Sequence, residues 1–246
     1  MARHAIVSTG DRPDLNNSRA LAPLRDGWPR FVLHDRVSND YRAAVSEFFP
    51  DFDVLLVEDS EVLGRAVAVT LAWDGHTATL PDGYDGAIVT AVNGHQAAVN
   101  PDTLCVVSAT VRTDRTGGGL AAALLTALRQ RAQRAGLLRM IVPVRPILKA
   151  NHPLTSMAEF MQWTRTDGLH PDPWIRTHQR LGAAIVAPAP RSMSVSGTVA
   201  QWEDWTNMRF EHSGRYTVPG GLDPVEINRE RDHGTYTETN LWMRHQ

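Results

Sequence analysis

Three consecutive glycines, Gly117 to Gly119, stand where a strand pattern gives way to a helix pattern. The preceding residues 104–111 (LCVVSATV) are apolar enough for a buried strand, and residues 120–135 carry leucine and alanine at helical spacing. Glycine lets the backbone approach a ligand closely, and the first N–H groups of a helix lack intrahelical partners and attract anions. The junction therefore predicts a binding site for a phosphate group.

The residues around the glycines narrow the choice of phosphate ligand. No Gly-Lys-Ser/Thr follows them, so the P-loop pattern is absent. Gly117, Gly119 and Ala122 fit the dinucleotide fingerprint G-x-G-x-x-A. However, the region about 20 residues further on has arginines and no carboxylate to hold a ribose. A nucleotide stays open as an alternative, and the pyrophosphate of coenzyme A is the third candidate.

The segment resembles the signature of the GCN5-related N-acetyltransferases, in which a strand is followed by V-H-P-D-Y-R-G-x-G-[IL]-[GA]-x-x-L-L. Here residues 111–125 read VRTDRTGGGLAAALL, and Thr116 stands where the family usually has Arg or Gln. The resemblance implies an α/β (α+β) fold with a mixed, mostly antiparallel central sheet flanked by helices on both faces. It also implies acyl-CoA, typically acetyl-CoA, or a phosphopantetheine thioester as co-substrate, without a metal. The residues it places against that co-substrate are Val111, Arg112, Thr116, Gly117, Gly118, Gly119, Leu120 and Ala121.

A second segment is also similar to the family, whose penultimate helix commonly ends Y-x-x-x-G before a strand. His178 occupies the tyrosine position, four residues before Gly182. The resemblance implies that His178 protonates the departing thiolate, which an imidazole can do near neutral pH. A histidine at the surface or at the edge of the core is the alternative. The backbone N–H of Val111 is expected to hold the thioester carbonyl.

The sequence does not identify a general base. Glu159, Asp172 and Glu203 are candidates, and each also fits a helix cap or a surface acid. Ser108 and Thr110 are two residues apart on the strand, so they share a face unless a bulge intervenes. The tryptophans Trp163, Trp174, Trp202 and Trp205 fit core positions better than a pocket lining.

The charge distribution suggests an anionic partner. The chain has 25 basic and 27 acidic residues, a net charge of −2, which indicates no nucleic-acid partner. From Arg115 to Ala158 there is no Asp or Glu, and the charge of that window is +7. The window is expected to face coenzyme phosphates or an acidic acyl carrier protein, and a solvated basic surface is the alternative. Arg145 and Lys149 are expected to meet a phosphate, a carboxylate substrate or that carrier protein.

Length and composition bound the remaining possibilities. The 246 residues with 42% hydrophobic content suffice for a large core, and one cysteine excludes a disulfide framework. No apolar run reaches membrane-spanning length and no signal peptide opens the chain, so we expect a cytoplasmic protein without a membrane partner. We expect one domain over residues 1–246, with an insertion at about 145–175 and a C-terminal extension at about 190–246.

The hydrophobic pattern predicts the elements that position these residues. Residues 1–30 are interpreted as irregular or partly helical. Helices are expected at 31–49, 85–93, 120–135, 156–163, 174–181 and 198–207, and strands at 53–58, 62–73, 104–111, 139–144 and 183–187. Residues 214–219 and 224–243 are expected to be strands or loops that close the sheet.

The predicted function is an acyltransferase that moves an acyl group from acyl-CoA or an acyl carrier protein to the amine of a small molecule. The layout of Val144-Arg145-Pro146 and of Asp172-Pro173 before His178 resembles family members of polyketide and related natural-product biosynthesis. One alternative is a decarboxylase of a malonyl-type thioester on the same scaffold. A second alternative is a non-catalytic protein that binds CoA. The oligomeric state is left open.

Overall fold

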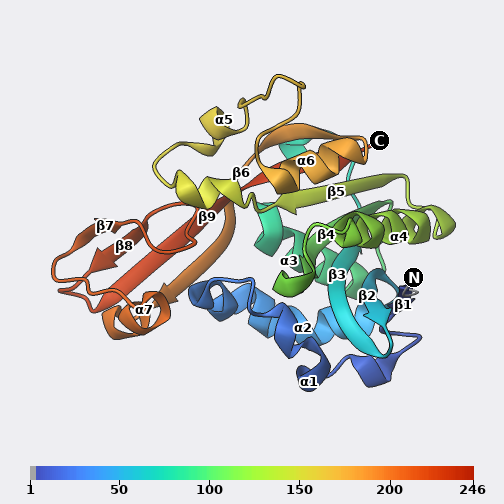
Figure 1. Cartoon of the computed structure of the whole chain (residues 1–246), viewed down its shortest axis with the longest axis horizontal. Coiled ribbons are helices and arrows are strands. Elements are labelled where there is room, and N and C mark those ends of the chain that lie inside the picture. Colours follow the sequence, from blue (N-terminus) through green and yellow to red (C-terminus); the bar gives the residue numbers. More distant parts are fainter. Residues whose placement is uncertain (1–3) are drawn as a thin grey trace.

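The computed structural model describes residues 4–246, and its nine strands form one sheet with helices on both faces (Figure 1). The strands are β1 (Ala5–Ser8), β2 (Asp53–Glu58), β3 (Glu61–Leu71), β4 (Thr103–Val111), β5 (Arg139–Val144), β6 (Ala183–Gly197), β7 (Gly214–Tyr216), β8 (Val225–Asn228) and β9 (His233–His245). The helices are α1 (Ser18–Leu21), α2 (Arg36–Phe48), α3 (Gly83–Gln96), α4 (Leu120–Arg134), α5 (Met157–Phe160), α6 (Pro173–Arg180) and α7 (Val199–Thr206).

The sheet is mixed and mostly antiparallel, as expected. Its strand order is β1-β2-β3-β4-β5-β9-β8-β7, and β6 pairs with the other side of β9. Among the pairings of the described residues, β4 with β5 is the parallel one. A parallel pair needs a crossover connection, which α4 supplies. No helix of residues 4–246 has the length and apolar character needed to cross a membrane.

Alternation along the strands builds a core on each face of the sheet. Leu104 packs in one core with Leu128 of α4 and Ile175 of α6. The next residue, Cys105, lies in the opposite core with Val92 of α3. This is the period of two expected for a strand whose two faces are both covered. Helices α4 and α6 thus flank one face, and α2 and α3 flank the other.

The C-terminal part of the chain forms a long hairpin with its own core. β6 was expected to end at residue 187, but it continues to Gly197 along β9. Pro188 and Pro190 interrupt the strand pattern in the sequence. Proline is tolerated here because β6 pairs with β9 alone, so its other edge needs no N–H donors. Beyond the last pairing with β5, β8 pairs with β9 and β7 pairs with β8, and α7 packs on this end.

The N-terminal segment is more regular than expected and reaches this distant hairpin. Ala5–Ser8 forms the edge strand β1 on β2, within a region that the sequence pattern left irregular. Phe31, just before α2, is 1% exposed, and its ring lies 5.6 Å from Trp202 and 5.0 Å from Tyr236. The N-terminal segment is therefore fixed to the C-terminal core by aromatic packing.

Truncating this aromatic anchor should destabilise the protein strongly. We expect Phe31→Ala to lower the free energy of unfolding by about 3–5 kcal/mol, because it removes a buried ring and leaves a cavity. Urea denaturation followed by circular dichroism measures the change. The control is Leu154→Ala, which truncates a side chain that is 81% exposed and should change stability by less than about 0.5 kcal/mol. A small effect of Phe31→Ala would contradict the anchoring role.

Candidate active site

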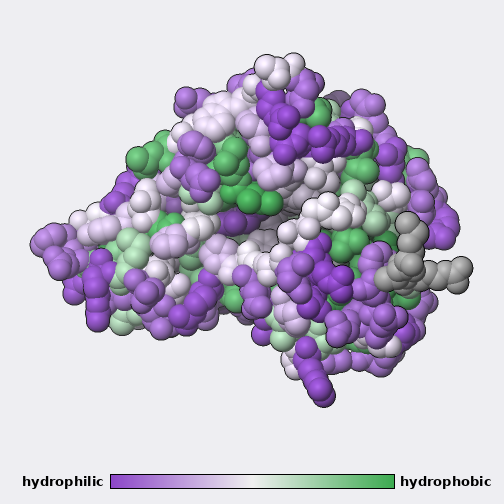
Figure 2. All heavy atoms as spheres, in the orientation of Figure 1, coloured by the Kyte–Doolittle hydropathy of each residue, from purple (hydrophilic) through white to green (hydrophobic). Residues whose placement is uncertain are grey.

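The sheet opens between β4 and β5. The two strands pair only from Thr103 to Cys105 of β4, after which they diverge. The divergence leaves a cavity of about 360 Å³ lined by both strands. Figure 2 shows the surface hollowed near the centre of this view, between β5 above and the α1–α2 region below.

A bulge in β4 accompanies this divergence. Ser108 pairs with Val67 of β3 and Val106 pairs with Ala68, which leaves Val107 as an extra residue. Ser108 and Thr110 both follow the bulge and line a neighbouring cavity that Ala109 and Val111 do not line, so they share a face as expected. The bulge thus changes the direction of β4, so that its second half faces the cleft.

Two backbone N–H groups of β4 face the opening. Arg112 N donates to Leu63 O on β3, and the pairing alternates along an antiparallel ladder. Val111 and Ala109 therefore direct their N–H groups away from β3, toward the gap that β5 leaves. These donors can stabilise an oxygen that gains negative charge, including that of a thioester carbonyl.

The glycine-rich turn lies at one end of the cleft and is open to ligands. Gly117 and Gly119 have φ of +88° and +76°, values that favour glycine, and a Cβ on either would meet nothing within 4 Å. Gly119 is the N-cap of α4, and Ala123 N is the first to bond back to it. The N–H groups of residues 120–122 consequently lack intrahelical acceptors. The arrangement can bind a phosphate or pyrophosphate group.

The other predicted cofactor residues differ in how they meet the cleft. Val111, Thr116 and Ala121 line the cavity, whereas Leu120 is partly buried against the core. The guanidinium of Arg112 is held by Asp114 and Glu61 at 2.8 and 3.0 Å. Arg112 therefore contributes through its backbone position rather than as a free cation.

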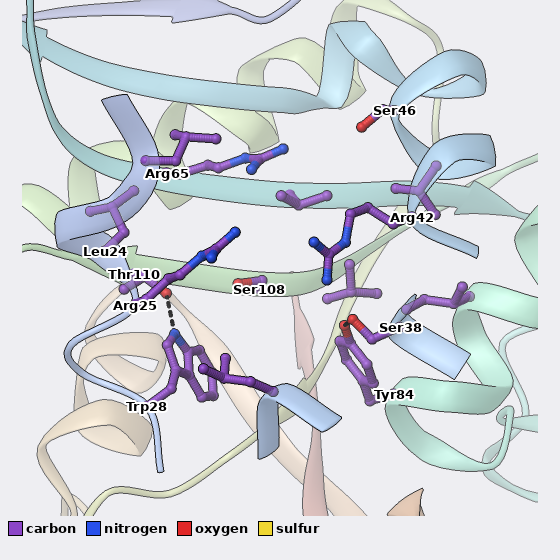
Figure 3. A pocket seen from close by; sticks show the side chains of 16 residues that line it. Leu24, Arg25, Trp28, Ser38, Arg42, Ser46, Arg65, Tyr84, Ser108 and Thr110 are labelled. Carbon is purple, nitrogen blue, oxygen red and sulfur yellow. Dashed lines mark hydrogen bonds between the residues drawn. The ribbon is translucent and has the colours of Figure 1, made fainter. Parts of the chain in front are cut away.

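A second cavity, of about 330 Å³, adjoins the first across β4 (Figure 3). The indole of Trp28 separates the two, and its Nε1 donates to Thr110 Oγ1 at 3.1 Å. Ser108 and Thr110 line both cavities. Trp28 could not be identified from the sequence, because a lone tryptophan in a polar segment carries no periodic signal. The site thus consists of two adjoining cavities that share Trp28, Ser108 and Thr110 in their lining.

Comparisons with known proteins support this architecture. No protein-family model matches the chain. A curated relative, the arginine N-acetyltransferase avaD of Aspergillus versicolor, is 27% identical over 98% of this chain and 93% of its own length. The loading GNATL domain of CurA from Lyngbya majuscula matches with a TM-score of 0.64 and 14% identity, over 99% of this chain and 98% of that domain. This chain has the GCN5-related N-acetyltransferase (GNAT) fold.

A second GNAT structure gives the same result. The GphF GNAT-like decarboxylase, solved in complex with isobutyryl-CoA, matches with a TM-score of 0.56 and 13% identity, over 99% of this chain and 98% of that chain. Both matches span the N-terminal segment and the long C-terminal hairpin. These segments therefore belong to the arrangement that this chain shares with the two GNAT structures.

His178 does not reach the GNAT cleft. It is fully buried, and its Nδ1 lies 3.0 Å from His245 Nε2. Trp174, one turn earlier on α6, lines the cleft and packs edge-on against the His178 ring. Burial, and then the neighbouring His245, lower the pKa of His178 to about 3, so its imidazole is neutral near pH 7. The predicted protonation of the thiolate by His178 has no geometric support in this structure.

The acid-free window does not form a free basic surface. Four of its arginines pair with carboxylates from other parts of the chain, so these side chains do not form the expected basic surface for a carrier protein. Within the window, the backbone of the glycine-rich turn remains open to an anion. Lys149 is fully buried and its Nζ donates to the carbonyls of His152 and Leu222, which excludes contact with a ligand phosphate. The four pairs are Arg115–Glu58, Arg131–Asp11, Arg139–Asp102 and Arg145–Glu238.

None of the three candidate bases lines either cavity. Asp172 caps α6, since its Oδ1 accepts from Trp174 N and Ile175 N. Glu203 pairs with Arg209, and Glu159 is an exposed residue of α5. The alternative interpretation of these acids, as caps or surface acids, is the one that the structure favours. Within residues 4–246, no His, Cys, Asp and Glu side chains cluster as metal ligands.

The buried histidine pair should make stability depend on pH. Burial, followed by the charge of Arg129, also lowers the pKa of His245, to about 4. Both values lie below the unfolded value of about 6.5, so protonation favours the unfolded chain. The stability that the two neutral histidines contribute should be fully present above pH 6.5. The free energy of unfolding should therefore fall as the pH drops from 6.5 toward 3.

Substituting one histidine isolates this effect. We expect His178→Phe to reduce the slope of unfolding free energy against pH between pH 6 and 4 by about 1.4 kcal/mol per pH unit at most. Urea denaturation at pH 7, 6, 5 and 4 provides the slopes, with the exposed His212→Gln as control. An unchanged slope in His178→Phe would show that the buried pair does not take part in acid unfolding.

Proposed function

We propose that the chain is an N-acetyltransferase that moves an acetyl group from acetyl-CoA to the amine of a small molecule. The observation that carries the proposal is the divergence of β4 from β5 next to the glycine-rich N-terminus of α4. The full-length similarity to an arginine N-acetyltransferase supports it and makes arginine the first amine to test. The general class of reaction is an acyl transfer without a metal.

In this proposal the two ends of acetyl-CoA bind at separate parts of the cleft. The pyrophosphate binds the N–H groups of Gly118 to Ala121, and the pantetheine arm extends between β4 and β5. The acetyl carbonyl accepts from the N–H of Val111, which stabilises the tetrahedral oxyanion. Binding both substrates in adjoining cavities supplies much of the rate by positioning.

The chemical step forms an amide bond and breaks the thioester. The amine nitrogen attacks the acetyl carbon from the second cavity, the C–S bond breaks, and the sulfur leaves as coenzyme A. Among residues 4–246, those that line the two cavities include no carboxylate and no imidazole. We infer that the amine loses its proton to water and that the sulfur receives a proton from solvent rather than from His178.

A decarboxylase is the second candidate, because the two similar GNAT structures described above are a loading domain and a decarboxylase. A free cation in the cleft between β4 and β5 would assist the binding of a malonyl carboxylate. Arg145 is the charged side chain that lines that cleft, and Glu238, which is fully buried, neutralises it at 2.9 Å. Among the described residues that line the cleft, this pairing leaves no free cation to attract a malonyl carboxylate, whereas an acetyl group needs none.

Mass spectrometry with acetyl-CoA and with malonyl-CoA separates the candidate functions. We expect N-acetylated amine from acetyl-CoA and no acetyl-CoA from malonyl-CoA. Decarboxylation of malonyl-CoA would support the second candidate instead. Binding of CoA without turnover of any amine would indicate a non-catalytic CoA-binding protein, and an acyl carrier protein loaded with acetate tests the other donor.

A charge placed in the glycine-rich turn should prevent CoA binding. Gly118→Asp sets a carboxylate at the N-terminus of α4, where the proposed pyrophosphate lies, and should raise the Kd for CoA by about 100-fold or more. Gly118→Ala is the matched control, because a Cβ at this position meets no atom closer than 3.8 Å. Isothermal titration calorimetry measures both. Equal binding by the two variants would contradict the pyrophosphate site.

A further inference from the structure

In the part of the chain that the structure describes, three arginines and no acidic residue line the second cavity. Arg25 follows the turn Ala22–Leu24, Arg42 lies on α2, and Arg65 lies on β3. Figure 3 shows Arg25 and Arg42 entering the cavity from opposite sides, near Ser108. Three cationic side chains around one space repel each other unless something neutralises them.

Only one of these arginines has an internal counter-ion among the described residues. Arg65 is held by both oxygens of Asp53, at 2.8 and 2.5 Å. Among residues 4–246, neither Arg25 nor Arg42 has a carboxylate within 4.0 Å, and Arg42 donates to the amide oxygen of Asn39 at 2.6 Å. The cavity therefore retains two positive charges directed at the space where the acceptor is expected.

Two other carboxylates, those of Asp35 and Asp85 near Tyr84, form no ion pair with these arginines. Asp35 Oδ2 accepts from Ser38 N and Asp85 Oδ2 accepts from Ser194 N, so both are engaged with backbone. Burial raises the pKa of both groups, and with the neighbouring Asp35 it raises that of Asp85 to about 8. The pair thus carries less negative charge at neutral pH than two exposed aspartates would.

Hydroxyl-bearing side chains also line the cavity, and they mark two of its sides. Tyr84 Oη donates to Ser38 Oγ at 3.1 Å, and both residues line the wall beside Arg42. Ser108 and Thr110 mark the β4 side, where the cavity adjoins the thioester cleft. An acceptor that spans the cavity would have its reacting group at β4 and its other end at the arginines.

We propose that the acceptor is an amine that also carries a carboxylate, of the amino-acid class, and that Arg25 and Arg42 bind this carboxylate and determine specificity. The inference rests on the proposed function, which supplies the amine and the acetyl donor. Guanidinium groups suit a carboxylate because their planar N–H donors match its two oxygens. A cationic amine without an anionic group would instead meet two unneutralised arginines.

The test compares amino acids with their decarboxylated amines. The pairs are arginine with agmatine, lysine with cadaverine, histidine with histamine and tryptophan with tryptamine, each assayed with acetyl-CoA. We expect kcat/KM for the best amino acid to exceed that of its decarboxylated partner by about 10- to 100-fold, the range for a charge-assisted hydrogen bond. Comparable or better turnover of the decarboxylated amines would overturn the proposal.

Two variants assign the effect to the cavity. Arg25→Gln and Arg42→Gln replace exposed side chains, and each should lower kcat/KM for the amino acid about 10-fold or more while turnover of the decarboxylated amine is unchanged or higher. The matched control is Arg36→Gln on the same helix, whose side chain pairs with Asp40 outside the cavity. An equal loss for both members of a pair would overturn the assignment.

A binding measurement separates this inference from the proposed function. If no amine is acetylated, the proposed function fails, and calorimetry with N-acetylarginine and N-acetylagmatine still tests the cavity. Tighter binding of N-acetylarginine that is lost in Arg42→Gln and retained in Arg36→Gln would support the carboxylate site. Equal binding of the two probes, or no binding of either, would overturn it.

Discussion

The parting of β4 from β5 is the constraint on which the rest of this structure depends. A sheet that splits gives up main-chain hydrogen bonds, and polar groups left without partners are costly when buried. The loss is tolerable here because the split is open to solvent and able to receive a ligand. The bulge at Val107 belongs to the same adjustment, since it turns the second half of β4 toward the opening.

The other side of the split is held in place by β9. Five residues of β5 pair with β9, which also pairs with β6, so β5 cannot close onto β4 without disturbing a long hairpin. Arg145 at the end of β5 is fixed to Glu238 of β9, and Tyr236 Oη also donates to that carboxylate. Buried networks of this kind confer a defined geometry, because removing one partner leaves an uncompensated charge.

The sequence predicted the centre of the molecule well and its periphery poorly. Residues 104–144 form a strand, a glycine-rich turn, a helix and a second strand. Each of these elements has a local sequence pattern, so it could be predicted from the sequence. The pairing of the arginines in the acid-free window could not be predicted from the sequence, because their partners reach the window only through tertiary contacts. These partners are Glu58, Asp11, Asp102 and Glu238. The position of His178 agrees better with the alternative interpretation, a histidine at the edge of the core, than with the role of proton donor that the family resemblance implied. Trp28 and the unpaired Arg25 and Arg42 had no periodic or motif signal at all.

The aromatic contact of Phe31 with Tyr236 has a consequence for how the protein folds. The two residues are separated by most of the chain, and the N-terminal segment that Phe31 anchors supplies Arg25 and Trp28 to the second cavity. Contacts between such distant residues raise the contact order and form late, because a long loop must close first. During synthesis, the β2–β5 core can assemble early, whereas the acceptor pocket acquires its final shape only after the β9 strand has emerged.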